Sequence, residues 1–168
     1  MPAEIQVPTG LTTDGLLGRR YLARFIDSIA IVLLIGILVL VFSVVVTGAG
    51  RVSNSVVLPV LLVVWIGYGA VLESSKGQAT IGKRLMGLRV YNAHGGRLAF
   101  TQAAGRNLLK DGPFLVFGAM PGSQLLTLVW LVAHLVVMHR SPVYQAIHDR
   151  AAQTWVAGPE ETTQLHIA

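Results

Sequence analysis

The sequence has no cysteine and few charged residues: charged side chains make up only 12% of the chain. The absence of cysteine excludes a disulfide scaffold, a thiol nucleophile, an iron–sulfur cluster and any zinc site with cysteine ligands. The shortage of charge leaves little polar surface for a soluble domain, because 53% of the 168 residues are hydrophobic and the mean hydropathy is +0.63. We therefore expect a membrane protein.

Acidic residues are the scarcer charged type, with 8 Asp+Glu against 13 Lys+Arg. In a soluble chain this excess would indicate nucleic-acid binding, but in an apolar chain the basic residues report topology. Three uncharged runs are each long enough to cross a bilayer. They predict an all-α membrane protein, a multi-pass helical bundle with spans at about 25–47 and 55–72 and a third apolar segment at 112–139.

The third apolar segment is 28 residues long, which exceeds one span, and it contains Pro121-Gly122. Two topologies follow: the segment crosses once and exports the C-terminus, or it bends at Pro121-Gly122 into a helical hairpin. The ascending arm of a hairpin would include residues 101–111, which brings Arg106, Lys110 and Asp111 towards the membrane, where they need partners. We expect the hairpin.

Basic residues gather before the first span and between the second and third, whereas Arg51 alone lies between the first two. By the positive-inside rule the N-terminus is cytoplasmic, the turn at 48–55 is outside, and a hairpin returns the C-terminus to the cytoplasm. The polar ends, residues 1–18 and 158–168, are expected to be flexible tails around a membrane domain at 19–157.

A short β-hairpin is expected in the long cytoplasmic segment. Leu88–Tyr91 and Arg97–Phe100 are strand-like and flank a turn that contains Gly95-Gly96. Two strands alone are marginally stable in water. The hairpin must therefore contact the membrane surface, the helix ends, or the last strand-like stretch, Thr154–Ala157.

Arg20, Arg24 and Asp27 share one face of the first helix, and the small Ala23 lets another helix approach closely. A carboxylate in hydrocarbon costs about 3 kcal/mol, so Asp27 must face protein, water or a cation. Two alternatives stay open for it. One is a structural ion pair with Arg24 or Arg20, and the other is a protonatable or cation-binding carboxylate in a transport path.

Residues 77–84 match G-x-x-x-x-G-K, but Arg84 stands where a P-loop needs Ser or Thr, and an apolar helix precedes the motif instead of a strand. We expect no nucleotide here. Lys83, Arg84 and Arg89 are instead expected to contact anionic lipid head groups or a partner. Glu73, at the end of the second run, is interpreted as a solvated helix terminus.

His148-Asp149 is the remaining cluster near the C-terminus. One His beside one Asp leaves a metal short of ligands, so we expect no metal. We expect Asp149 to be a buried carboxylate that pairs with Arg106 or Arg20, with His148 as a pH-sensitive neighbour. No nucleophile and base are paired and no cofactor motif is present, so the chain is not expected to be an enzyme or to hold a cofactor.

Three blocks occur in order: R-x-x-A-R-x-x-D at 20–27, G-x-x-T-I-G-K-R-L-x-G-L-R-V at 77–90, and A-x-x-R-N-L-L at 103–109 followed by H-D-R-x-A-x-T at 148–154. Their combination resembles the RDD family of small bacterial integral membrane proteins over about residues 19–157. By motif position the two aspartates of the family name correspond to Asp27 and Asp149, and the arginine corresponds to Arg20 or, less naturally, Arg24. Arg106 also matches a recurrent family position.

The resemblance implies a multi-pass protein of the bacterial plasma (inner) membrane. A transport role has been suggested for the family, and some members are described as sodium/proton antiporters. We expect transport of a small cation or other small ligand through a cytoplasmic-side cluster of Arg20, Arg24, Asp27, Arg106, His148 and Asp149. The alternative is a non-catalytic accessory or assembly subunit of a larger membrane complex. The expected partners are anionic lipid and either further copies of the chain or that complex.

Overall fold

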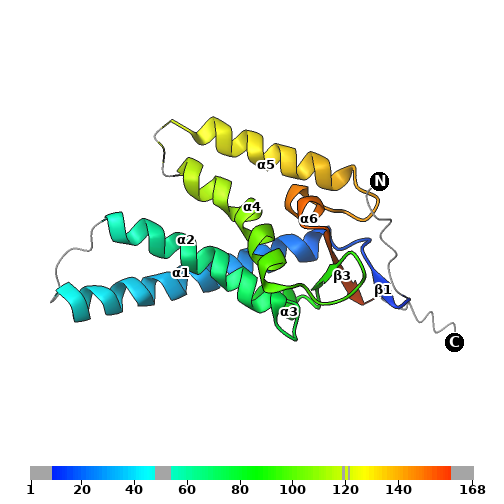
Figure 1. Cartoon of the computed structure of the whole chain (residues 1–168). Coiled ribbons are helices and arrows are strands. Elements are labelled where there is room, and N and C mark those ends of the chain that lie inside the picture. Colours follow the sequence, from blue (N-terminus) through cyan, green and yellow to red (C-terminus); the bar gives the residue numbers. More distant parts are fainter. Residues whose placement is uncertain (1–8, 48–53, 119, 121, 160–168) are drawn as a thin grey trace, which may run out of the picture.

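The computed structural model describes residues 9–47, 54–118, 120 and 122–159. Its four long helices are α1 (Leu17–Thr47), α2 (Asn54–Ser74), α4 (Phe100–Gly118) and α5 (Gln124–His139). They form two helical hairpins that extend to the same side in Figure 1, and a small sheet and two short helices lie at the opposite end. Those short helices are α3 (Ile81–Leu85) and α6 (Ile147–Ala151).

Among the described residues, α1 is the one helix that is both long and apolar enough to cross a membrane, over Leu17–Val45. Its uncharged stretch begins directly after Asp27, and many of its large apolar side chains are exposed. The last part of α2, Pro59–Ser74, and α5 are shorter apolar helices. The structure is therefore mostly helical, as predicted, with one clearly membrane-compatible helix.

The apolar segment at 112–139 forms parts of two helices, α4 and α5. Gly122 adopts φ +79°, a left-handed conformation that glycine accommodates without strain, and Pro121 lies outside the described residues. The ascending helix begins at Phe100, so it includes Arg106, Lys110 and Asp111. The helical hairpin predicted for this segment is present, with its ascending arm extended as expected.

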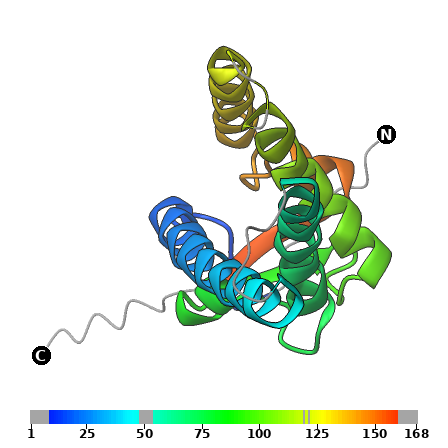
Figure 2. The same cartoon turned by 90° about the vertical axis from the view of Figure 1, so that its left-hand side faces the viewer.

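The long helices contact one another in the order α1, α2, α4, α5. Seen nearly end-on in Figure 2, they form an open arc, with α1 in blue to cyan at one end and α5 in yellow at the other. α1 and α5 are the two ends of this row, but residues of both helices line one cavity, which is described below. This arrangement brings residues from the start of α1 near residues from the end of α5.

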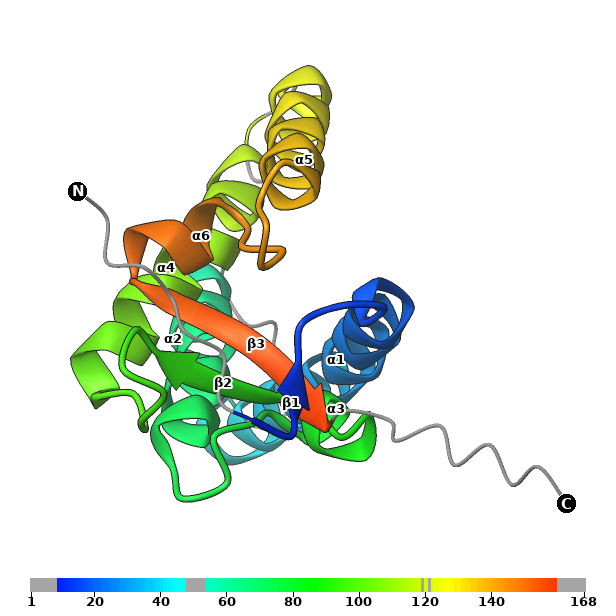
Figure 3. The ribbon, with the colours of Figure 1, turned by 90° about the vertical axis from the view of Figure 1, so that its right-hand side faces the viewer.

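The predicted β-hairpin is wrong. β2 (Arg89–Asn92) pairs antiparallel with β3 (Thr154–Pro159), and β3 pairs on its other edge with β1 (Leu11–Thr12). The second predicted strand does not form because Asn92 closes the turn: its Oδ1 accepts the Gly96 N–H at 2.9 Å, and the chain enters α4 at Phe100. The partner is instead the strand-like stretch at the C-terminal end (Figure 3).

The assignment of residues 1–18 to a flexible tail is wrong for residues 11–18, since β1 pairs with β3 and Leu16 is buried in the core. Gly158 and Pro159 likewise belong to β3, while residues 1–8, 48–53 and 160–168 lie outside the described residues. The core joins the sheet to the helix ends. Its buried members are Leu16, Ala23, Ala70, Leu88, Val90, Leu98, Ala103 and Val156.

Two glycines permit close helix contacts that position the charged residues. A Cβ on Gly82 would lie 2.1 Å from the Ala23 carbonyl oxygen, and one on Gly69 would lie 2.2 Å from Asn107 Oδ1. The first contact packs α3 against α1, which confirms that Ala23 admits a close neighbour. The second packs α2 against α4 beside a buried polar side chain.

Candidate functional site

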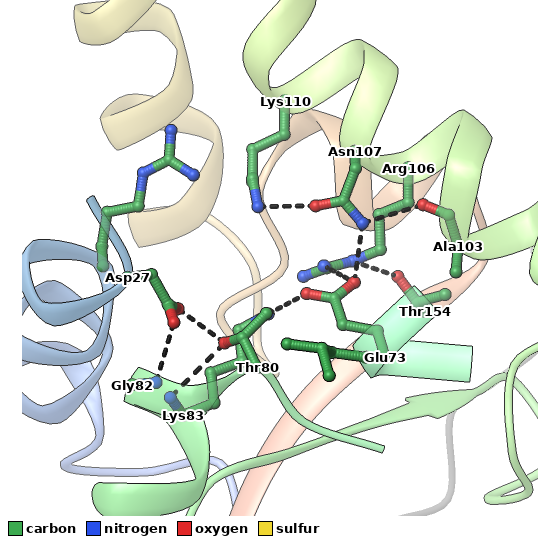
Figure 4. Close-up of polar contacts among 12 residues, drawn as sticks. Asp27, Glu73, Thr80, Gly82, Lys83, Ala103, Arg106, Asn107, Lys110 and Thr154 are labelled. Carbon is green, nitrogen blue, oxygen red and sulfur yellow. Dashed lines mark hydrogen bonds and ion pairs between the residues drawn. The ribbon is translucent and has the colours of Figure 1, made fainter. Parts of the chain in front are cut away.

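Arg106 is the centre of a buried polar network at the helix ends. Its side chain, on α4, is almost fully buried and contacts carboxylates from two other helices. Nε and Nη2 lie 2.9 and 2.7 Å from Asp149 Oδ1. Nη1 lies 2.6 Å from Glu73 Oε2, and Figure 4 shows these two side chains together. One guanidinium thus ties α2, α4 and α6 together with charge-assisted hydrogen bonds.

Glu73 is fully buried, so its interpretation as a solvated helix terminus is wrong. Besides Arg106, it accepts hydrogen bonds from Asn107 Nδ2 at 2.9 Å and from Lys83 Nζ. The last turn of α2 packs under α4, and that packing excludes water from the carboxylate. Lys83 therefore points inward to Glu73, and its predicted contact with a lipid head group or a partner stays a prediction.

The buried ammonium group of Lys83 titrates abnormally. Burial, reinforced by the charges of Arg106 and Lys110, lowers the pKa of Lys83 to about 7, although its ion pair with Glu73 opposes the shift. Lys83 therefore changes charge close to neutral pH, unlike an exposed lysine.

Asp149 pairs with both of the arginines that the sequence proposed as alternatives. Arg20 Nη2 lies 2.9 Å from Oδ2, opposite the Arg106 contact to Oδ1, and the Ala146 N–H donates to Oδ2 at 3.2 Å. Burial alone would raise the pKa of Asp149, but Arg106, His148 and Arg20 hold it well below its usual range. Asp149 is consequently a permanent carboxylate that joins the start of α1 to α6.

Asp27 is satisfied by three hydrogen-bond donors. Tyr68 Oη donates to Oδ1 at 2.8 Å, the Gly82 N–H donates to Oδ1 at 2.7 Å, and Thr80 Oγ1 donates to Oδ2 at 2.5 Å. Within the part of the chain that the structure describes, Asp27 makes no ion pair, so the pairing proposed with Arg24 or Arg20 is wrong. Asp27 instead holds the start of α3 against α1 (Figure 4).

Arg24 pairs with Asp111 of α4, which also lies 3.3 Å from Lys110 Nζ. Lys110 Nζ donates to Asn107 Oδ1 at 2.7 Å, and Asn107 in turn donates to Glu73. These contacts supply the partners that charged residues on the ascending arm were expected to need. They also connect α1 to the Arg106 cluster in one continuous network.

His148 extends the network to α5. Its Nδ1 lies 2.8 Å from His134 Nε2 with the two rings stacked, and its Nε2 lies 3.4 Å from Asp149 Oδ1. Burial holds the pKa of His148 well below its usual value despite the nearby carboxylate. The distances fit neutral rings in which His134 Nε2–H donates to His148 Nδ1 and the single N–H of His148, on Nε2, faces Asp149.

A cavity of about 200 Å³ lies beside this network. It is bordered by α1, α4, α5 and the α6 region. Four apolar side chains of its lining, which we call the apolar wall, are those of Phe114, Leu131, Leu135 and Met138. Other lining residues are cationic. The charged or titratable lining residues are Arg20, Arg24, Asp27, Lys83, Arg106, Lys110, His134 and His148.

The charges are arranged with cations towards the cavity and most carboxylates behind them. Five cationic side chains line the cavity with Asp27, whereas Glu73, Asp111 and Asp149 are not among the lining residues. Those three carboxylates contact the cations from the protein side. When Lys83 is protonated, below about pH 7, five cations against four carboxylates leave one excess positive charge, with both histidines neutral. A cavity lined in this way favours an anion.

Arg84 and Arg89 are exposed and do not line this cavity, so their contact with lipid or a partner stays a prediction. The structure brings together Arg20, Arg24, Arg106, His148 and Asp149 as expected, with Asp27 held separately at α3. Sequence reasoning missed Tyr68, Glu73, Thr80 and Asn107 as network members. The signal for Thr80 and Asn107 was their place inside the ordered motif blocks.

Comparison with known proteins agrees with these motif blocks. A family model described as RDD family matches residues 15–153, which include every charged member of the polar network. A search of the curated proteins gives no match to this chain.

Proposed function

This chain belongs to the RDD family, and from that premise we propose that it is a multi-pass plasma-membrane protein that binds a small anionic ligand at the cytoplasmic ends of its helices. The family is associated with membranes, and α1 is long and apolar enough to cross one. The observation that carries the ligand class is the wall of five cations around the cavity.

The multi-pass part of the proposal rests on the two helical hairpins. Both hairpins extend away from the sheet, and the charged residues of α1 and α4 lie at the sheet end (Figure 1). In this arrangement the polar network lies at the cytoplasmic interface and the hairpin tips face the other side, as the distribution of basic residues favours. Both termini are then cytoplasmic.

The charge arrangement favours an anion over a cation. Asp149 and Glu73 each accept hydrogen bonds from two cations, and Asp27 accepts three from neutral donors. A cation would have to displace these donors, whereas an anion meets cationic side chains that already face the cavity. Transport of the bound ligand between the two hairpins is part of the proposal, because the cavity is bordered by α1 from one hairpin and α4 and α5 from the other.

The ligand class is tested by thermal unfolding of the detergent-purified full chain in sulfate, inorganic phosphate or chloride at equal ionic strength. Lys110→Gln removes one cation from the cavity lining. Asp111, which contacts Lys110 in the wild type, keeps Arg24 as its ion-pair partner in this variant. Lys76→Gln is the matched control because Lys76 is exposed and outside the cavity. Sulfate and phosphate should raise the midpoint of the wild type and Lys76→Gln more than that of Lys110→Gln. An equal rise in all three proteins contradicts anion binding in the cavity.

Topology is tested separately with reporters. A fluorescent protein that folds only in the cytoplasm should be active when it is fused after Ala168, and a periplasmic phosphatase should be inactive there. The opposite pattern would show that α4 and α5 do not form a membrane hairpin.

A further inference from the structure

We propose that the occupant of the cavity is the phosphodiester head group of an anionic phospholipid, with its acyl chains along the apolar wall. The inference rests on the proposed anionic ligand and names its source. Three observations on the cavity carry it: its position at the start of the uncharged run of α1, the mixed chemistry of its lining, and its exposure between α1 and α5.

The first observation is the position of the cavity relative to the uncharged run of α1. Four lining residues, Arg20, Tyr21, Arg24 and Asp27, occupy the first turns of α1, and the uncharged run of 23 residues begins at Ser28. If α1 crosses the bilayer, this position is the boundary between hydrocarbon and polar head groups. A lipid phosphate at this boundary would already be level with the cations, whereas a soluble anion would have to be drawn from water.

The second observation is the mixed chemistry of the lining. Its guanidinium and ammonium groups match a phosphate through charge-assisted hydrogen bonds. The apolar wall, made of Phe114, Leu131, Leu135 and Met138, offers no polar partner in its side chains. A small hydrated anion would leave this wall facing water, while a lipid would cover it with hydrocarbon.

The third observation is the opening of the cavity to the surface. Tyr21 on α1 and Leu131 on α5 both line the cavity and are 49% and 43% exposed, so the cavity reaches the surface between these two helices. α1 and α5 are the two ends of the open helical arc (Figure 2). Next to this opening, Phe25 of α1 and Leu128 of α5 are also more than half exposed. An acyl chain can therefore enter from the bilayer without crossing the protein interior.

Arg20 and Arg24 keep N–H donors that their partners inside the protein do not use. The guanidinium of Arg20 makes one contact to Asp149 and one to the Tyr144 carbonyl, and Arg24 contacts Asp111 through Nη2. A guanidinium has five N–H donors, so both arginines retain donors for a phosphate. The carboxylates behind the wall hold the cations in place, which reduces the entropy lost when a ligand binds.

The experiment compares ligands that share either the head or the tails. The detergent-purified full chain is titrated with dioleoyl phosphatidylglycerol, dioleoyl phosphatidylcholine and tailless glycerophosphoglycerol, and bound ligand is counted by native mass spectrometry. The anionic lipid should bind about tenfold more tightly than either of the others. Lys110→Gln should weaken its binding about tenfold, and Lys76→Gln should leave it unchanged.

A second variant tests the apolar wall without touching a charge. Leu135→Ser should weaken binding of phosphatidylglycerol but not of glycerophosphoglycerol, since only the lipid has tails. If the tailless head group binds the wild type as tightly as the lipid does, the proposal of a lipid is overturned, and the proposal of an anionic ligand is retained. If neither binds, both proposals fail. Equal loss in Lys76→Gln and Lys110→Gln would mean that the lipid binds only the basic surface, which also overturns the site.

Discussion

Arg106 and Asp149 are 43 residues apart in the chain, and the Arg106 guanidinium places Nε and Nη2 2.9 and 2.7 Å from a single carboxylate oxygen of Asp149. The other oxygen of Asp149 binds Arg20, which joins the beginning of the described chain to its end. The carboxylate is fully buried. Arg20 depends on it for charge compensation, and Arg106 is compensated by both Asp149 and Glu73.

Asp149→Asn should destabilise the protein by about 3 kcal/mol, because Arg20 loses its carboxylate partner and Arg106 keeps only Glu73. The midpoint of thermal unfolding in detergent measures the loss. Asp14→Asn is the matched control, since Asp14 is exposed and should shift the midpoint very little. Equal midpoints for the two variants would show that the Asp149 ion pairs do not hold the fold together.

Gly69→Ala should destabilise the contact between α2 and α4, because the new Cβ would lie 2.2 Å from Asn107 Oδ1. Asn107 would have to move, and Glu73 would lose a hydrogen-bond donor. Gly67→Ala, on the same helix, meets nothing within 4 Å and is the control. We expect a loss of about 1 to 3 kcal/mol for Gly69→Ala and none for Gly67→Ala. Tolerance of both substitutions contradicts the packing of α2 on α4.

The helical organisation could be predicted from the sequence because it depends on long apolar runs. The helical hairpin at 112–139 follows from segment length and Pro121-Gly122, and the sequence offers Arg106 or Arg20 as partners of Asp149. The stretch that pairs with β2 is one of three alternatives that the sequence leaves open. The burial of Glu73 against Arg106 could not be predicted, because it depends on how α2 packs on α4. For Asp27 the sequence predicts an arginine as the structural partner because of its charge. Its donors in the structure are a tyrosine, a threonine and a backbone amide.

His148 should make the protein less stable as the pH falls from 7 to 5. Burial keeps its folded-state pKa well below the usual value, so only the unfolded chain takes up the proton in this range, and protonation favours unfolding. His148→Gln should reduce the pH dependence of the unfolding free energy by about 1 to 2 kcal/mol. The exposed His94→Gln is the control. An unchanged slope in His148→Gln would show that folding does not lower the pKa of this histidine.

Binding of sulfate should weaken as the pH rises from 6 to 8. Burial lowers the pKa of Lys83 to about 7, so this lining residue is cationic below pH 7 and becomes neutral above it. Sulfate keeps its charge throughout, and we expect a loss of affinity of about threefold to tenfold by calorimetric titration. Lys83→Arg, which stays protonated, should bind with little dependence on pH. A wild-type affinity that is constant across this range contradicts a role for Lys83 in the ligand site.

Equilibrium dialysis of the purified full chain at pH 6 against radiolabelled sulfate and, separately, radiolabelled sodium tests most directly whether the cluster binds an anion. We expect about one sulfate per chain in the wild type and in Lys76→Gln, a loss of sulfate in Lys110→Gln, and no sodium binding that depends on Asp27. Sodium binding that Asp27→Asn abolishes, together with sulfate binding that is equal in Lys110→Gln and wild type, would contradict the anionic site.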